Sequence, residues 1–145
     1  MNKPRYATAA ELRVIKEFLL IPMVLSVFER DTKIINSSVR SPGAYVDAIK
    51  RAMDLATKEI TTIKQFFRLK GIKIIQQEKR ETGVHASYLC RGYRNDLSLL
   101  WSFIEAEVDI RKRRYLGENI KAIVLENDND HFILSKSPPV NVEDL

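Results

Sequence analysis

Apolar residues recur at helical spacing in three long segments of the chain, and the first covers residues 9–36. Its apolar positions follow steps of three and four: Leu12, Ile15, Phe18 and Leu19. Thr8 and Glu11 match the capping box that opens a helix. Pro22 lies inside the segment and cannot donate a backbone hydrogen bond, so we predict that this first helix is kinked there.

The second segment carries the longest helical stripe. Its apolar positions are Tyr45, Ile49, Ala52, Ala56, Ile63 and Phe67, and the stripe skips one turn. Ser41 and Pro42 match a hydroxyl cap followed by proline at the first helical position. Gly71 is the type of residue that ends a helix in the left-handed conformation. These features predict a helix over residues 44–69.

The third segment follows Asn95 and Asp96, either of which suits a helix cap. Its predicted buried seam is Leu97, Leu100, Trp101, Ile104, Val108 and Tyr115, and Gly117 ends it. Two pairs have the spacing of helical ion pairs: Glu107–Arg111 and Asp109–Arg113. Arg111 also falls on the seam, where it suits either an interface between copies or an arginine whose aliphatic stem packs within the chain.

Between the second and third helices, residues 72–75 and 84–93 have strand character. Thr82 and Gly83 form a suitable two-residue turn, because glycine accepts positive φ without steric cost. This turn sets a register with the facing pairs Ile75–Cys90 and Gln77–Tyr88. A lone two-stranded ribbon is marginal in water, so one face is expected to rest on the helices.

Together these elements predict a mainly α fold with a minor β part. It has three long helices, the first kinked at Pro22, with a β-hairpin over residues 72–93 between the second and third. A short strand-like extension follows Gly117, as an apolar strand, a polar turn and another strand. Residues 1–136 are expected to form one helical domain, and residues 137–145 a flexible acidic tail.

Composition adds bounds to this picture. A chain of 145 residues with 45% hydrophobic and 30% charged residues is long enough for one buried core. Its single cysteine excludes an internal disulfide framework and suits a reducing compartment. No signal peptide is recognisable, and the most apolar run, Phe18–Phe28, is shorter than the about 20 residues that span a bilayer. We therefore expect a cytoplasmic protein without a membrane segment.

Charge is distributed unevenly along the chain. Residues 117–145 hold six acidic residues against two lysines, a net charge of −4, whereas the whole chain carries +5. A basic body with an acidic end suits polyanions, although ordinary helix-surface charge explains the same pattern more simply. The residues predicted to contact a partner or nucleic acid are Lys70, Lys73, Lys79, Arg80, His85, Tyr88, Arg91, Arg94, Arg111, Lys112, Arg113 and Arg114.

A helix followed by a basic hairpin suggests a winged helix, whose wing follows the phosphates of DNA. Against this, the helix before the hairpin is about twice as long as ordinary helices. Cations are also favoured at the end of the third helix by the helix dipole alone. A winged-helix-like DNA-binding regulator is therefore the alternative prediction.

No pattern in the sequence predicts catalysis, a metal or a cofactor. The candidate ligands are His85, Cys90, His131, Asp128 and Asp130, which lack the spacing of zinc and calcium motifs. His85 and Cys90 lie five residues apart on a strand and hence on opposite faces, which argues against a Cys–His pair. Glu105 and Asp109 share a helix face, and a solvated face explains them better than an acid–base pair.

The segments IPMVLSVFERD and YLCRGYRNDLSLLWSFIEAEVDIRKRRYLG resemble uncharacterised small helical proteins of Bacillus-type bacteria and their phages. The resemblance implies a cytoplasmic bacterial or phage origin and brings no activity with it. The first prediction is therefore a non-enzymatic interaction or regulatory protein. Because a hairpin edge and long apolar stripes are hard to satisfy within a monomer of 145 residues, we expect a homodimer.

Overall fold

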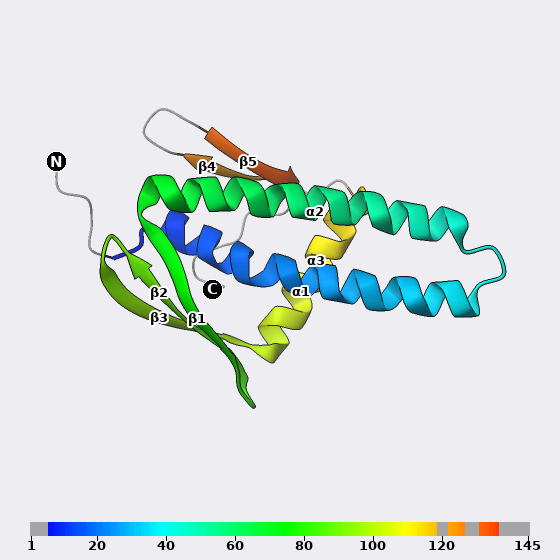
Figure 1. Ribbon diagram of the computed structural model, residues 1–145, viewed down its shortest axis with the longest axis horizontal. Coiled ribbons are helices and arrows are strands. Elements are labelled where there is room, and N and C mark those ends of the chain that lie inside the picture. The colour runs from blue at the N-terminus through cyan, green and yellow to red at the C-terminus, as the bar shows by residue number, and fades with distance from the viewer. Residues whose placement is uncertain (1–5, 119–121, 127–130, 137–145) are drawn as a thin grey trace.

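The computed structural model describes residues 6–118, 122–126 and 131–136 (Figure 1). Within these ranges the chain forms three helices, a three-stranded antiparallel sheet and a two-stranded ribbon. The helices are α1 (Ala9–Ser38), α2 (Gly43–Lys70) and α3 (Trp101–Tyr115). The strands are β1 (Ile72–Lys79), β2 (Gly83–Cys90), β3 (Tyr93–Leu100), β4 (Ala122–Glu126) and β5 (His131–Lys136).

The first two helices form an antiparallel pair along the long axis of the molecule (Figure 1). The predicted capping box opens α1, since Thr8 and Glu11 exchange side-chain and backbone hydrogen bonds of 2.9 and 3.1 Å. The helix passes through Pro22 as one element and ends two residues later than predicted. The predicted Ser41 cap is wrong, because Pro42 is the N-cap of α2 and no side chain caps it.

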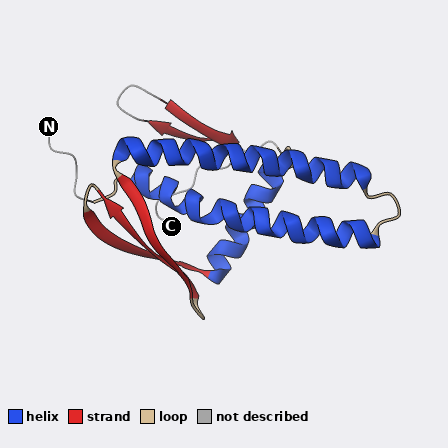
Figure 2. Ribbon diagram, in the orientation of Figure 1, coloured by secondary structure: helices blue, strands red, loops and turns tan. Residues whose placement is uncertain are grey.

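The predicted hairpin is part of a three-stranded sheet in the order β1-β2-β3, which lies between α2 and α3 in the sequence (Figure 2). The tight turn from β2 to β3 is Arg91-Gly92, whose φ angles are 51° and 88°. Asn95 and Asp96 therefore lie within β3 instead of capping a helix, and α3 begins at Trp101. Alternation of inward and outward side chains, with a period of two, prevails over the helical spacing in this segment.

The register between β1 and β2 also differs from the prediction. Glu81 and Thr82 form the turn, closed by a hydrogen bond of 2.7 Å from the Arg80 N–H to the Gly83 carbonyl. Gln77 consequently faces Ala86, and a bulge at Ile75 shifts the pairing again. Gly83 does not have positive φ. Glycine is needed at this position because β3 passes so close that a Cβ atom would clash with it.

One core joins the helices to the inner face of the sheet. The inward residues of β2 are Val84, Ala86, Tyr88 and Cys90, all buried beside the apolar positions of α1 and α2. Three predicted core residues are partly outside it, since Tyr45 is 59%, Leu100 60% and Trp101 37% exposed. No helix among the described residues is both long and apolar enough to cross a membrane.

The two strands predicted after α3 are confirmed, and the residues of the predicted turn between them, 127–130, lie outside the described residues. Gly117, with a φ of 107°, follows the end of α3 as predicted. Strands β4 and β5 pair antiparallel, and β5 lies against α2 and α3 (Figure 2). The predicted acidic tail at residues 137–145 lies outside the described residues.

Candidate interaction surfaces

Arg91 fixes the sheet to the helices at the β2–β3 turn. Its guanidinium donates to both carboxylate oxygens of Glu11, at 2.9 and 3.0 Å, and to the Lys70 and Tyr6 carbonyls. Burial by itself raises the pKa of Glu11, but the hydrogen bonds from Arg91 and from the Thr8 N–H outweigh it and lower that pKa. One ion pair thus joins the start of α1, the end of α2 and the sheet.

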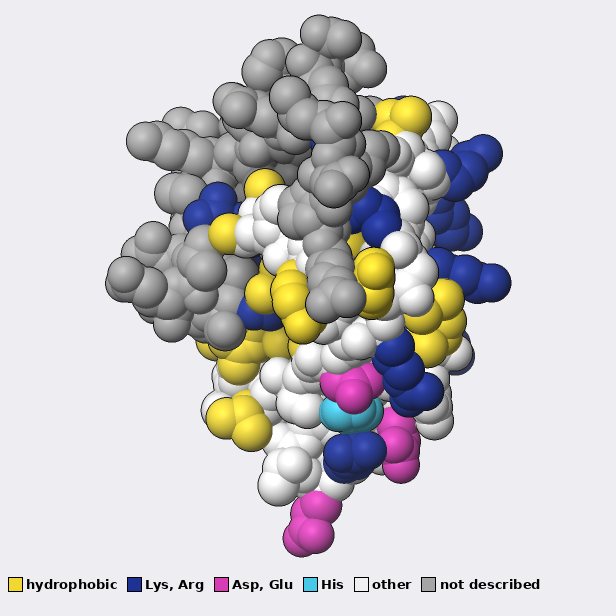
Figure 3. Space-filling view, turned by 90° about the vertical axis from the view of Figure 1, so that its left-hand side faces the viewer, with side chains coloured by type: hydrophobic (Ala, Val, Ile, Leu, Met, Phe, Trp, Pro, Cys, Tyr) yellow, Lys and Arg dark blue, Asp and Glu magenta, His cyan; other side chains and the backbone are white. Residues whose placement is uncertain are grey.

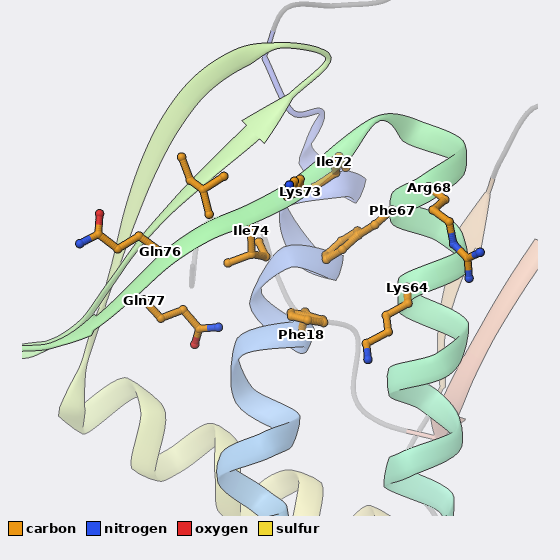
Figure 4. Close-up of a pocket in the computed structure, with 10 residues that line it drawn as sticks. Phe18, Lys64, Phe67, Arg68, Ile72, Lys73, Ile74, Gln76 and Gln77 are labelled. Carbon is orange, nitrogen blue, oxygen red and sulfur yellow. The ribbon is translucent and has the colours of Figure 1, made fainter.

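A groove of about 640 Å³ runs beside β1, and we call it the β1 groove (Figure 4). Its lining is Phe18, Lys64, Phe67, Arg68 and the consecutive residues Ile72, Lys73, Ile74, Ile75, Gln76 and Gln77. Because successive side chains of a strand point to opposite faces, a groove that touches six in a row follows the edge of the strand. Phe18 and Phe67 pack with ring centroids 5.2 Å apart and form its apolar wall.

A second groove of about 730 Å³ lies between α1 and α3 and is called the α1–α3 groove. Its lining is Met23, Ser26, Val27, Arg30, Lys79, Trp101, Ile104, Glu105, Val108, Asp109 and Lys112. Trp101 is held at its edge by a hydrogen bond of 3.0 Å from Nε1 to the Arg80 carbonyl. A smaller hollow of about 240 Å³ shares Lys112 and adds the exposed apolar residues Ile34 and Leu116.

The outer face of the sheet carries a polar cluster at the end of the molecule shown in Figure 3, where acidic, basic and histidine side chains gather. His85 Nδ1 lies 3.0 Å from Ser98 Oγ, and His85 Nε2 lies 3.8 Å from Asp96 Oδ1. The hydrogen bond from Ser87 to Asp96, of 2.5 Å, lowers the pKa of Asp96. The cluster stands on an open face and lines neither groove.

His85 and Cys90 lie on opposite faces of β2, as predicted. Cys90 is fully buried, and burial raises the pKa of its thiol, which keeps the thiol protonated and poorly nucleophilic. Among the described residues no three His, Cys, Asp or Glu side chains are grouped to hold a metal. Asp128 and Asp130 lie outside the described residues, as does the side chain of His131.

A buried ionic cluster at the junction of the three helices was not predicted from the sequence. Arg111 donates to both oxygens of Glu17, and these side chains are 2% and 1% exposed. Arg114 and the Tyr115 hydroxyl both bond to Glu59 on α2. The sequence did contain a signal for this cluster, namely the turn skipped by the apolar stripe of α2. Glu59 occupies that turn and faces inward.

The twelve predicted contact residues do not form one surface. Tyr88, Arg111 and Arg114 are buried and unavailable to a partner, so the prediction of a contact is wrong for these three. Arg91 is engaged with Glu11, and Arg113 with Asp109 at 3.0 Å. Lys73 lines the β1 groove, and Lys79 and Lys112 line the α1–α3 groove. The other four lie on different elements: Lys70 ends α2, Arg80 precedes the β1–β2 turn, His85 lies on β2 and Arg94 on β3.

These features define a small α+β protein in which a helical pair, a three-stranded sheet and a third helix enclose one core. The model of the family described as YhjD protein matches residues 6–120, so the chain belongs to that family. No curated protein and no solved structure matches the chain. The likeness to proteins of Bacillus-type bacteria and their phages stays a prediction.

Proposed function

We propose that this chain is a non-catalytic interaction protein that acts as a homodimer, with the α1–α3 groove as the contact between copies. The observation that carries the proposal is an apolar groove floor, in which Met23, Val27 and Trp101 are partly exposed, with a rim that bears charges of both signs. The floor is formed by Met23, Val27, Trp101, Ile104 and Val108. Tryptophan and methionine are enriched in protein interfaces, and burial of such a floor supplies the driving force for association.

The charges of the rim suit contact with an identical copy. In a two-fold dimer the same patch lies on both sides, so the patch must complement itself. The cations on the rim are Arg30, Lys79 and Lys112, and the anions are Glu105 and Asp109. A rim with both signs allows the basic part of one copy to face the acidic part of the other, whereas a rim of one sign would repel its own copy.

The test is light scattering over a roughly hundredfold range of protein concentration. Glu105→Lys should weaken the dimer roughly tenfold, because the altered charge occurs twice in a symmetric interface. Asp47→Lys makes the same charge change on the exposed face of α2 and should leave the dimer unchanged. A monomer at every concentration would overturn the proposal, and so would an equal effect of both variants.

The alternative of a DNA-binding regulator stays a prediction. It requires the cations of the hairpin and of α3 on one accessible surface, and Arg111 and Arg114 are buried in ion pairs. Lys79 and Arg80 remain exposed at the end of the hairpin, where they could reach phosphates.

A further inference from the structure

We propose that the β1 groove binds an extended acidic segment of another protein, which adds as a strand beside β1. The proposal concerns a different surface from the α1–α3 groove and holds whether or not the chain dimerises. Among the residues that the structure describes, three features of the groove carry it: an unpaired strand edge, an apolar wall and a rim of cations without acidic neighbours.

The strand edge offers backbone hydrogen bonds. Within the described residues, β1 pairs with β2 on one side and with no strand on the other. Hydrogen-bonded and non-hydrogen-bonded pairs alternate along an antiparallel ladder, and bonds of 2.7 Å at Gly71–Arg91 and Arg80–Gly83 fix its two ends. Because both end pairs are hydrogen-bonded, every second residue inward, beginning next to each end pair, points its backbone N–H and C=O groups away from β2. These residues are Ile72 and Ile74 from one end, and Lys79 and Gln77 from the other.

Of these residues, Ile72, Ile74 and Gln77 line the groove, so a segment placed there can continue the ladder. The bulge at Ile75 interrupts the regular spacing, which limits the added strand to a short one. Figure 4 shows Phe18, Phe67 and Ile74 gathered between β1 and the two helices. Alternate side chains of an added strand would meet this apolar wall, while those between them point away from it.

The charge of the lining selects the occupant. Lys64, Arg68 and Lys73 are exposed, and no acidic residue is among the ten that line the groove. None of the three forms an ion pair within the described part of the chain. An acidic segment neutralises them, whereas a second copy would bring two sets of these cations together. The occupant is therefore an extended segment in which acidic and apolar residues alternate.

The probe is a fluorescein-labelled peptide of about eight residues that alternates glutamate with valine, titrated with the full chain and followed by anisotropy. The double variant Lys64→Glu with Arg68→Glu should bind it at least roughly tenfold more weakly. Lys50→Glu with Arg51→Glu is the matched control, since it makes the same charge change on an exposed part of α2 outside the groove. This control should bind like the wild type.

Backbone pairing is tested without altering the protein. The same peptide with an N-methyl group on every residue keeps its charge but has no backbone N–H to donate to β1, so its affinity should fall to that of a peptide alternating lysine with valine, which the cations of the groove repel. In heteronuclear NMR spectra, the amides of Ile72, Ile74 and Gln77 should shift on addition of the unmodified peptide.

Four outcomes would overturn the proposal: no binding, equal binding of the N-methylated peptide, unshifted β1 amides, or equal weakening in the control variant.

Two further outcomes would overturn it by assigning a different occupant to the groove. Amide shifts along β1 that depend on protein concentration without peptide would mean that a second copy fills it. Binding of duplex DNA, lost in Lys64→Glu with Arg68→Glu and without peptide binding, would mean a phosphate surface. Light scattering tests the dimer contact at the α1–α3 groove separately, so failure of the dimer proposal can be distinguished from failure of the β1 groove proposal.

Discussion

Gly83 shows how one residue determines the packing of two strands. A Cβ at this position would lie 1.9 Å from the carbonyl oxygen of Leu99 on β3, which is part of the backbone and cannot rotate away. Gly83→Ala must therefore separate β2 from β3, and we expect it to lower the free energy of unfolding by roughly 2–4 kcal/mol. Urea denaturation followed by circular dichroism measures the change.

Gly43 is the control for this substitution. A Cβ there has no atom within 4 Å, and the residue lies at the start of α2, where alanine suits a helix better than glycine. Gly43→Ala should leave stability unchanged or raise it slightly. A loss at Gly83 no larger than at Gly43 would mean that the two strands can move apart at little cost.

At the scale of elements, the link between Glu11 and Arg91 predicts a dependence of stability on pH. The pKa of Glu11 is lower in the folded chain than in the unfolded chain. The ion pair therefore stabilises the fold above the ordinary glutamate pKa, and this stabilisation is lost as pH falls through the lowered value. Glu11→Gln should cost about 1–3 kcal/mol at pH 7 and should reduce the loss of stability between about pH 5 and pH 3.

Urea unfolding at several pH values measures this difference. Glu81→Gln, at an exposed site in the hairpin turn, removes the same charge without removing an ion pair with Arg91 and should keep the pH profile of the wild type. An identical profile for Glu11→Gln would mean that other carboxylates dominate the acid sensitivity.

The helices were predictable from the sequence because their apolar stripes are long, and the cap of α1 and the glycine after α2 mark two of their ends. Strand β3 was not predictable, because the spacing of three between Leu97 and Leu100 is typical of a helix although both residues lie in the strand. The deciding signal was Arg91-Gly92 directly between Cys90 and Tyr93. Glycine at the second position of a two-residue turn is the usual signature, but arginine at the first is not.

The candidate site was predictable only in part. Lys73 and Lys79 were predicted as contact residues and are exposed on β1, where each lines a groove, but the grooves themselves depend on packing between segments far apart in the chain. Phe18 and Ile74 line one groove together although 56 positions separate them, and no local pattern reports such a contact. Arg111 was noticed on the apolar seam of α3, yet its partner Glu17 lies 94 positions away.

At the scale of the whole molecule, the buried ionic cluster ties all three helices together. Arg111 joins α3 to α1 through Glu17, and Glu59 of α2 accepts from Arg114 and Tyr115. The Arg114 guanidinium also lies 4.7 Å from the centre of the Tyr115 ring. Burying charges costs free energy, so such a cluster stabilises the fold weakly but penalises any packing that separates the partners. We infer that it fixes how the helices are aligned.

A double-mutant cycle on Glu17 and Arg111 tests this inference. Arg111→Met leaves the Glu17 carboxylate buried without its main partner. Glu17→Leu likewise leaves the Arg111 guanidinium buried without its main partner. Each substitution should therefore lower the free energy of unfolding by about 3–5 kcal/mol. The double variant replaces the pair by apolar side chains and should cost less than the sum of the two single losses, by a coupling of at least about 2–3 kcal/mol. Asp109 and Arg113, exposed on the same helix, should show little or no coupling. In one outcome, the double variant is as stable as the wild type and yet gives poorly dispersed NMR spectra. That result would mean that the pair selects one packing of the helices and adds little to the free energy of unfolding. Additive losses at the buried pair would instead mean that Glu17 and Arg111 act independently, and the cluster would then not align the helices.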